Sequence, residues 1–299
     1  MQEAPALRPL SVGDIIDRTI RLYRANVVLF FVVAALPTLI VEVLQRAFGL
    51  SQTFDLNDLT TAFSTPGGTA TFPRQLQPAN PVAAFAIGLV AFVLFMAQYG
   101  ALVYAVGQRY LGRPTSVRDA YVQGLRATPR LFLSALVVIV VVSVVFIAVF
   151  VGVATLNTRA FAAVALILGL IGFFVLFPYV VLSLAVLGPA IVLEGLGPIT
   201  AIRRSFHLMK KARWRTFGLY ILMAIISSLL GLIFTLLFFV SFVSEPTVRT
   251  VLQTIANVAS AAVSYPLLYG SLAILYYDLR VRKEAFDLQL AAEALPREA

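Results

Sequence analysis

SVGDIIDRTIRLYR, residues 11–24, is the stretch of sequence that decides the fold. Its apolar and small residues recur at i, i+3, i+4, i+7, i+8 and i+11, which places them along one side of an α-helix. The same offsets hold apolar or small residues in SVRDAYVQGLRATP, residues 116–129, and in GPITAIRRSFHLMK, residues 197–210. Because each stretch leads into a long hydrophobic region, we predict three copies of one unit. Each unit is an amphipathic helix on the membrane surface followed by a hairpin of two spanning helices.

The starts of these three helices are also marked in the sequence. Ser11-x-x-Asp14 and Ser116-x-x-Asp119 are typical of capping boxes, in which the serine caps the helix and the acid reaches back. Gly197 is followed by a proline at the first helical position, which suits a helix start. We therefore expect a single membrane domain, residues 1–299, with repeat units at residues 11–106, 116–187 and 197–277 and a cytoplasmic tail at 278–299.

Composition indicates that a bilayer surrounds most of the chain. Hydrophobic residues make up 60% and charged residues 12% of the sequence, whereas about 25% of a soluble domain is charged. A spanning helix needs about 20 mainly apolar residues. Six segments meet this requirement, and they predict an all-α polytopic integral membrane protein with six transmembrane helices: residues 25–45, 81–106, 131–156, 161–187, 216–242 and 250–277. The polar connection from Ala47 to Asn80 has the composition of a loop, and Asn157–Arg159 of a tight turn.

The positive charge predicts both the orientation and the partners of the chain. Nineteen of its 23 Lys and Arg residues lie in the N-terminal segment, in the second-to-third and fourth-to-fifth connections and in the tail. Basic loops stay on the cytoplasmic side, so we expect a multi-pass protein of the cytoplasmic (inner) membrane with both termini in the cytoplasm. We also expect the N-terminus to be retained, because acids and arginines precede the first apolar run. Because the bases lie beside hydrophobic spans, anionic lipid headgroups are the expected partner, not nucleic acid.

The basic residues beside the spans are the candidate lipid- or partner-facing site. A soluble cytoplasmic protein or a second copy of the chain is the other kind of partner considered, docking on the segment EGLGPITAIRRS that begins at Glu194. The candidate residues are Arg18, Arg21, Arg24, Arg126, Arg130, Arg203, Arg204, Lys210, Lys211, Arg280 and Arg282.

Polar residues inside the spans suggest a second kind of site. Gln98, Tyr179, Asn257 and Tyr265 are candidates to line a cavity near Pro178 and Pro266, as in a transporter with broken helices. The simpler interpretation for the two amides is hydrogen bonding between helices. Glu42 is the ionisable residue closest to a span interior, and an interfacial pair with Arg46 accounts for it.

The residues that enzymes use are sparse. The chain has no cysteine and one histidine, His207, so we expect no metal site, no cofactor and no catalytic residues. Asp278, Arg280, Arg282 and Glu284 are expected to form local ion pairs after the last span, and the alternative is a headgroup or partner site. An intramembrane enzyme acting on lipid would instead require acids or histidines clustered at one interface.

Three stretches resemble a known family of six-span proteins. They are LSVGDIIDRTIRLYRAN at Leu10–Asn26, LEGLGPITAIRRSFHLMKKARWRTFG at Leu193–Gly218 and LLYGSLAILYYDLRVRKEAFDLQL at Leu267–Leu290. The chain is similar there to the membrane domain of glycerophosphoryl diester phosphodiesterases and to YciC-like membrane proteins. In fused members the hydrolase domain follows the membrane domain. The resemblance therefore implies the membrane part alone, without phosphodiesterase activity in this polypeptide.

Two functions follow as hypotheses. The first is a cytoplasmic-membrane protein without a catalytic domain, which acts as a lipid-interacting or partner-docking scaffold. The alternative is a transporter or permease component for a lipid-like or small solute.

Overall fold

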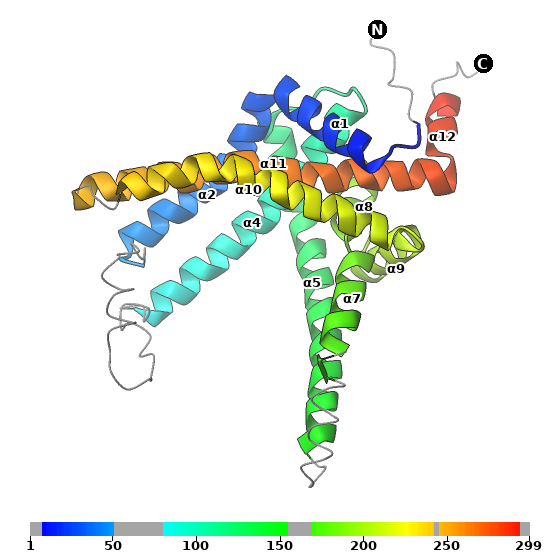
Figure 1. The fold of residues 1–299 in the computed structure, drawn as a ribbon, viewed down its shortest axis with the longest axis horizontal. Coiled ribbons are helices and arrows are strands. Elements are labelled where there is room, and N and C mark those ends of the chain that lie inside the picture. Colours follow the sequence, from blue (N-terminus) through cyan, green and yellow to red (C-terminus); the bar gives the residue numbers. More distant parts are fainter. Residues whose placement is uncertain (1–7, 51–79, 155–168, 171, 242–244, 294–299) are drawn as a thin grey trace.

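The computed structural model describes residues 8–50, 80–154, 169–170, 172–241 and 245–293. All regular secondary structure in these ranges is helical (Figure 1). Most of the polar connection between the first two spans and the turn at Asn157–Arg159 lie outside the described residues. The elements are α1 (Val12–Ala25), α2 (Val27–Ala47), α4 (Pro81–Tyr110), α5 (Val117–Ala154), the π-helical turn η2 (Gly172–Leu176), α7 (Phe177–Ser183), α8 (Leu187–Glu194), α9 (Pro198–Met209), α10 (Arg213–Ser241), α11 (Pro246–Glu284) and α12 (Phe286–Glu293).

Six helical stretches in the described part of the chain are long and apolar enough to cross a membrane. Their outward surfaces are apolar too; Val28 on α2 and Val82 on α4, for example, are each 76% exposed. Exposed side chains of this kind are favourable only where hydrocarbon surrounds them. The chain is therefore an all-α, multi-pass membrane protein. The spans are Val27–Ala47, Pro81–Tyr110, Val117–Ala148, Phe174–Glu194, Arg213–Phe234 and Thr247–Glu284.

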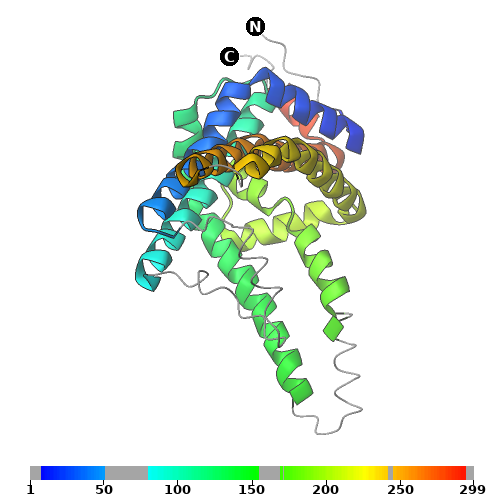
Figure 2. The ribbon, with the colours of Figure 1, turned by 60° about the vertical axis from the view of Figure 1, so that its left-hand side comes forward.

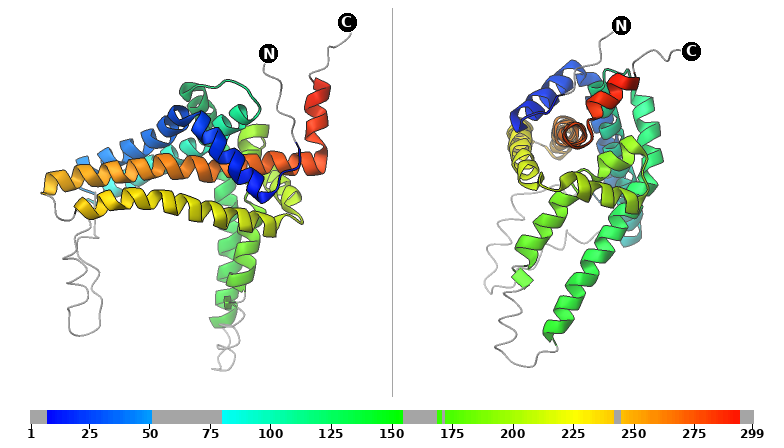
Figure 3. Two further views of the ribbon diagram at one scale, coloured as in Figure 1. Left: turned by 45° about the horizontal axis from the view of Figure 1, so that its top comes forward. Right: turned by 90° about the vertical axis from the view of Figure 1, so that its right-hand side faces the viewer.

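The helices diverge from a common end of the molecule, called here the terminal end. It holds α1, the first described helix, together with α9 and α12, the last described helix (Figure 1). From there α2 and α4, α5 and α7, and α10 and α11 extend in three directions, and Figure 2 shows the α5–α7 pair pointing away from the rest. Helix α11 packs against α10, α2, α4 and α1, and the view along it in Figure 3 shows it surrounded by other helices. It is the central element of the fold.

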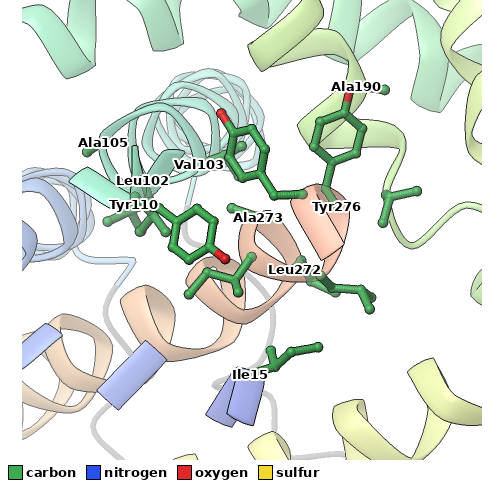
Figure 4. Close-up of a cluster of buried hydrophobic side chains, with 14 of the residues drawn as sticks. Ile15, Leu102, Val103, Ala105, Tyr110, Ala190, Leu272, Ala273 and Tyr276 are labelled. Carbon is green, nitrogen blue, oxygen red and sulfur yellow. The ribbon is translucent and has the colours of Figure 1, made fainter. Parts of the chain in front are cut away.

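The core includes the terminal end and continues along parts of α2, α4 and α11, where Ala34, Ala97 and Ala262 are at most 1% exposed. From Ala273 to Tyr276 the side chains of α11 are 0% exposed, so all sides of the helix are covered there. A helix that is hydrophobic on all sides is buried on all sides. Figure 4 shows Leu272, Ala273 and Tyr276 among side chains from other helices. Ile15 from α1 and Leu102 from α4 belong to the same cluster, so the first amphipathic stretch packs under the helix bundle.

The second amphipathic stretch, residues 116–129, is not a separate helix. We predicted a separate surface helix at residues 116–129, but α5 runs without interruption from Val117 to Ala154 through Pro129. The other two units have a break at the equivalent point. Asn26 leaves the helical conformation between α1 and α2, and the chain turns through Lys211, whose φ is +67°, between α9 and α10. A proline alone bends a helix and does not end it when the surroundings hold the axis.

The fourth span also differs from its prediction at residues 161–187, part of which falls outside the described residues. Helix α7 ends at Ser183, and α8 begins at Leu187 after a short turn. The helix restarts where Gly188 faces Tyr99 of α4. A Cβ on that glycine would lie 1.9 Å from the tyrosine oxygen, so only glycine permits this approach. The other four spans agree with their predicted ranges to within several residues at each end.

Candidate functional site

The candidate site is built at the terminal end, where three amphipathic stretches meet the ends of the spans. Ser11 and Asp14 form the predicted capping box at the start of α1, and these hydrogen bonds from Ser11 lower the pKa of Asp14 below its ordinary value. Ser116 and Asp119 make the same contacts at the start of α5. The residue before the first cap, Leu10, is completely buried.

Leu10 is held by a group of charged residues, called here the Asp278 cluster. Its backbone N–H donates to Asp278 Oδ1 at 2.6 Å. Its carbonyl oxygen accepts from Arg215 and from Arg282, the latter at 2.6 Å. Arg215 also donates to Asp278 Oδ2 at 2.6 Å, and Arg282 Nε lies 3.1 Å from the same oxygen. A buried carboxylate is tolerated only when it is paired in this way, and the cluster fixes α1 and α10 to α11.

A second group, the Glu194 cluster, joins α8, α9 and α11. Arg204 Nη2 donates to Glu194 and to Glu284, both at 2.8 Å. The hydroxyl of Tyr276 donates to Glu194, and Arg280 Nε lies 3.3 Å from Glu284 and 3.5 Å from Glu194. The hydrogen bond to Glu284, together with the one to Glu194, raises the pKa of Arg204 above its ordinary value, although burial opposes the rise. The predicted local ion pairs therefore exist, but they belong to larger networks.

These networks divide the eleven predicted lipid-facing bases. Arg204, Arg280 and Arg282 are used within the protein, as just described. Arg18 donates to the Tyr110 hydroxyl at 3.0 Å, and Arg130 donates to the Gly195 carbonyl at 3.0 Å. Arg21 pairs with Asp17 on the exposed face of α1. The remaining five side chains are exposed and have no hydrogen bond or ion pair to another described residue: Arg24, Arg126, Arg203, Lys210 and Lys211.

Sequence reasoning missed three bases that the fold brings to this end. Arg215 belongs to the Asp278 cluster. Lys283 Nζ donates to the carbonyls of His207 at 2.9 Å and Lys210 at 2.8 Å, which places its charge at the end of α9. Arg213 lies over the Tyr179 ring at 4.2 Å and donates from Nε to Ser183 Oγ at 2.7 Å. The signal for Arg213 was its position beside Trp214, an aromatic residue at the start of a span.

Two hollows open beside α7. A groove of about 800 Å³ lies between α7 and α10, with Pro178, Tyr179, Arg213 and Trp214 among its lining residues. A smaller cavity of about 330 Å³ lies between α5, α7 and α9. Apart from Gly172 its lining is apolar and includes Ile202 and Phe206 from the third amphipathic stretch.

Of the four polar residues predicted to line a cavity, only Tyr179 lines either of these two hollows. Gln98 is buried and donates to the Ala34 carbonyl of α2. Asn257 donates to Glu42 at 2.8 Å, and Tyr265 stacks on Tyr269. Both amides therefore bond between helices, the simpler of the two interpretations. Glu42 also pairs with Arg46 at 3.1 Å, as predicted.

The three acids of the Asp278 and Glu194 clusters are all paired with arginine. Asp278, Glu194 and Glu284 each lie within ion-pair distance of at least two guanidinium groups. Oppositely charged residues of different helices attract one another, so the geometry is suited to holding helices together. No group of three or more metal-ligating side chains occurs among the residues that the structure describes.

Comparison with known proteins assigns the chain to a domain family whose function is unknown. The model of a domain family of unknown function, DUF7847, matches residues 10–276, which include all six spans except the end of the last. No curated protein and no solved structure matches the chain.

Proposed function

We propose that this chain, which belongs to the DUF7847 family of unknown function, is a non-enzymatic scaffold of the cytoplasmic membrane that binds anionic lipids. The observation that carries the proposal is the set of five exposed bases at or beside the terminal end, Arg24, Arg126, Arg203, Lys210 and Lys211, which have no carboxylate partner among the described residues. Unpaired bases beside apolar helices attract anionic headgroups, and each contributes on the order of 1 kcal/mol.

The distribution of charge along the chain supports the cytoplasmic orientation in this proposal. The terminal end carries the basic connections, so the positive-inside rule assigns it to the cytoplasm. The inner leaflet carries anionic lipid, so the unpaired bases then face the membrane surface that attracts them most. A soluble cytoplasmic protein or a second copy of the chain is the other partner this face would accept.

The resemblance to the membrane domain of glycerophosphoryl diester phosphodiesterases leads to the same proposal. Its closing motif includes Asp278, Arg280, Arg282 and Glu284, and these residues hold helices together in the two clusters. We accordingly propose that the shared motif maintains the fold of a membrane module.

Lipid preference in a defined bilayer tests this function. The full chain is reconstituted in nanodiscs that contain equal amounts of phosphatidylglycerol and phosphatidylcholine, then released in mild detergent and examined by native mass spectrometry. We expect retained phosphatidylglycerol to exceed phosphatidylcholine, and the excess to shrink as salt is raised, because salt screens exposed charges.

A variant with all five unpaired bases changed to glutamine is the matched comparison. It should lose the preference while its helix content stays that of the wild type, because none of the five side chains holds another described residue. Equal retention of the two lipids by the wild-type chain would refute the proposed function.

A further inference from the structure

We propose that the groove between α7 and α10 is a binding site for one anionic phospholipid, with an acyl chain along α7 and the phosphate at the α9–α10 turn, Lys210–Trp214. This inference rests on the proposed function and adds a defined place, a stoichiometry and a mode of binding. The five unpaired bases alone imply only a diffuse attraction to a charged surface. The groove adds a second, apolar component directly beside two of them.

The walls of the groove are suited to hydrocarbon. Apart from the groups at its mouth they are apolar, and Phe174, Val175 and Leu176 from η2 line the groove together with Phe217 from α10. Gly172 and Leu182 mark its two ends along the chain, which is roughly 15 Å at 1.5 Å per residue. Figure 1 shows α7 and α10 diverging below the terminal end. Two apolar walls that separate inside a bilayer are filled by acyl chains, because water there is unfavourable.

The mouth of the groove has the chemistry of a phosphate site. Arg213 is fixed by its stack on Tyr179 and by the bond from Nε to Ser183 Oγ. That geometry leaves the two terminal nitrogens of its guanidinium without a bonded partner among the described residues, and such a pair of donors matches two phosphate oxygens. Lys210 and Lys211 precede it in the same turn, and Lys283 Nζ is held 2.8 Å from the Lys210 carbonyl.

Neighbouring acids do not cancel this charge. Glu194 and Glu284 are the acids of the adjacent cluster, and both are already paired with Arg204 and Arg280. Trp214 is 84% exposed at the mouth, and tryptophan is enriched where headgroups meet hydrocarbon. The three features match the three parts of a phospholipid. The basic residues would contact the phosphate, the indole of Trp214 would lie at the level of the glycerol, and the apolar groove would hold an acyl chain.

Photo-crosslinking locates the lipid directly. The full chain is reconstituted in phosphatidylcholine nanodiscs with a small fraction of phosphatidylglycerol that carries a diazirine in one acyl chain. A parallel sample contains phosphatidylcholine with the same diazirine chain. After illumination, mass spectrometry of peptides identifies the labelled residues. We expect phosphatidylglycerol to label Phe174–Leu182 and Phe217 several times more than phosphatidylcholine does.

The double variant Lys210→Gln/Lys211→Gln should reduce this labelling by about fivefold for each lysine removed. The variant Lys210→Arg/Lys211→Arg keeps the charge and should restore it, which excludes a general folding defect. The matched control is Arg24→Gln/Arg126→Gln, which removes two unpaired bases outside the groove and should leave the groove labelling unchanged.

Three outcomes would overturn the site. They are equal labelling of the groove by both lipids, labelling that is unaffected by the lysine variant, and labelling that the control variant reduces equally. If phosphatidylglycerol is retained in the native mass spectra while the groove stays unlabelled, the site is refuted and the proposed function stands. If neither is observed, both are refuted.

Discussion

Asp278 has no exposed side-chain surface, yet it accepts hydrogen bonds from Leu10, Arg215 and Arg282. At the scale of the residue, this arrangement explains why bases that look alike in the sequence behave differently. Arg282 and Arg204 compensate buried or half-buried carboxylates, whereas Lys210 and Lys211 have none to compensate. The first kind stabilises the fold, and the second kind is available to a ligand. Sequence spacing from a span does not distinguish the two.

Substitution of Asp278 tests whether the arginines paired with it stabilise the fold. Asp278→Asn removes the negative charge between Arg215 and Arg282 and should destabilise the folded chain by about 3 kcal/mol, because breaking a buried ion pair leaves uncompensated charge. Thermal unfolding in detergent, followed by circular dichroism, measures the change. Asp17→Asn is the matched control, because its pair with Arg21 is exposed on both sides and such pairs contribute about 0–1 kcal/mol. Equal effects of the two changes would contradict the assignment.

At the scale of the element, the contact between α4 and α5 depends on glycine. A Cβ on Gly124 would lie 2.4 Å from the Ala97 carbonyl oxygen, and one on Gly100 would lie 3.0 Å from the Gly124 backbone. Close backbone approach through small residues is the usual means of packing helices in membranes. The same contact explains why α5 continues through Pro129 without a break. Gly124 holds the amphipathic part of α5 against α4 shortly before the proline.

Alanine substitution tests this contact. Gly124→Ala forces the two backbones apart and should destabilise the fold by about 1–3 kcal/mol, as overpacking does. Gly88→Ala on α4 is the control, because a Cβ there meets nothing within 4 Å, and the change should be neutral or stabilising by up to about 1 kcal/mol through helix propensity. Unfolding in detergent compares them. A Gly124→Ala protein as stable as Gly88→Ala would show that α4 and α5 are not in close contact.

At the scale of the whole molecule, the helices share one tightly packed end and separate beyond it. The buried core lies around Ala273–Tyr276 and the contacts between α1, α4, α8 and α11. Exposed apolar side chains cover the more distant parts of the spans, such as Ile147 on α5 and Leu229 on α10. The Asp278 and Glu194 clusters join helices at the packed end, and the apolar parts of the spans extend from it.

The orientation of this molecule in the membrane is directly testable because the chain has no cysteine. Leu288→Cys places a thiol on α12 at the terminal end, where the native side chain is 66% exposed. Thr60→Cys places one in the connection after the first span. We expect a membrane-impermeant maleimide to label Thr60→Cys in intact cells and Leu288→Cys only in inverted membrane vesicles, because basic segments stay inside. The reverse pattern would contradict the proposed orientation.

The sequence by itself determined the local features: six spans, two capping boxes and three amphipathic stretches. Hydropathy over 20 residues and side-chain spacing over 14 are properties of contiguous chain, so they can be read without a fold. The same is true of the pair formed by Glu42 and Arg46, which lie one helical turn apart. The cavity predicted from four polar residues needs residues of three different spans to meet, and hydropathy and spacing along the chain do not carry that information.

Only the tertiary structure decided which basic side chains have a hydrogen-bond or ion-pair partner among the described residues and which have none. Leu10 and Asp278 are separated by 268 positions and Arg204 and Glu284 by 80, yet each pair is hydrogen-bonded. No local pattern encodes such a partnership, because it depends on the path that brings α1, α9 and α10 to the end of α11. The groove beside Arg213 has the same origin, since its two walls come from separate hairpins. Six of the eleven predicted bases thus make hydrogen bonds or ion pairs within the protein. The other five are exposed and have no such partner among the described residues.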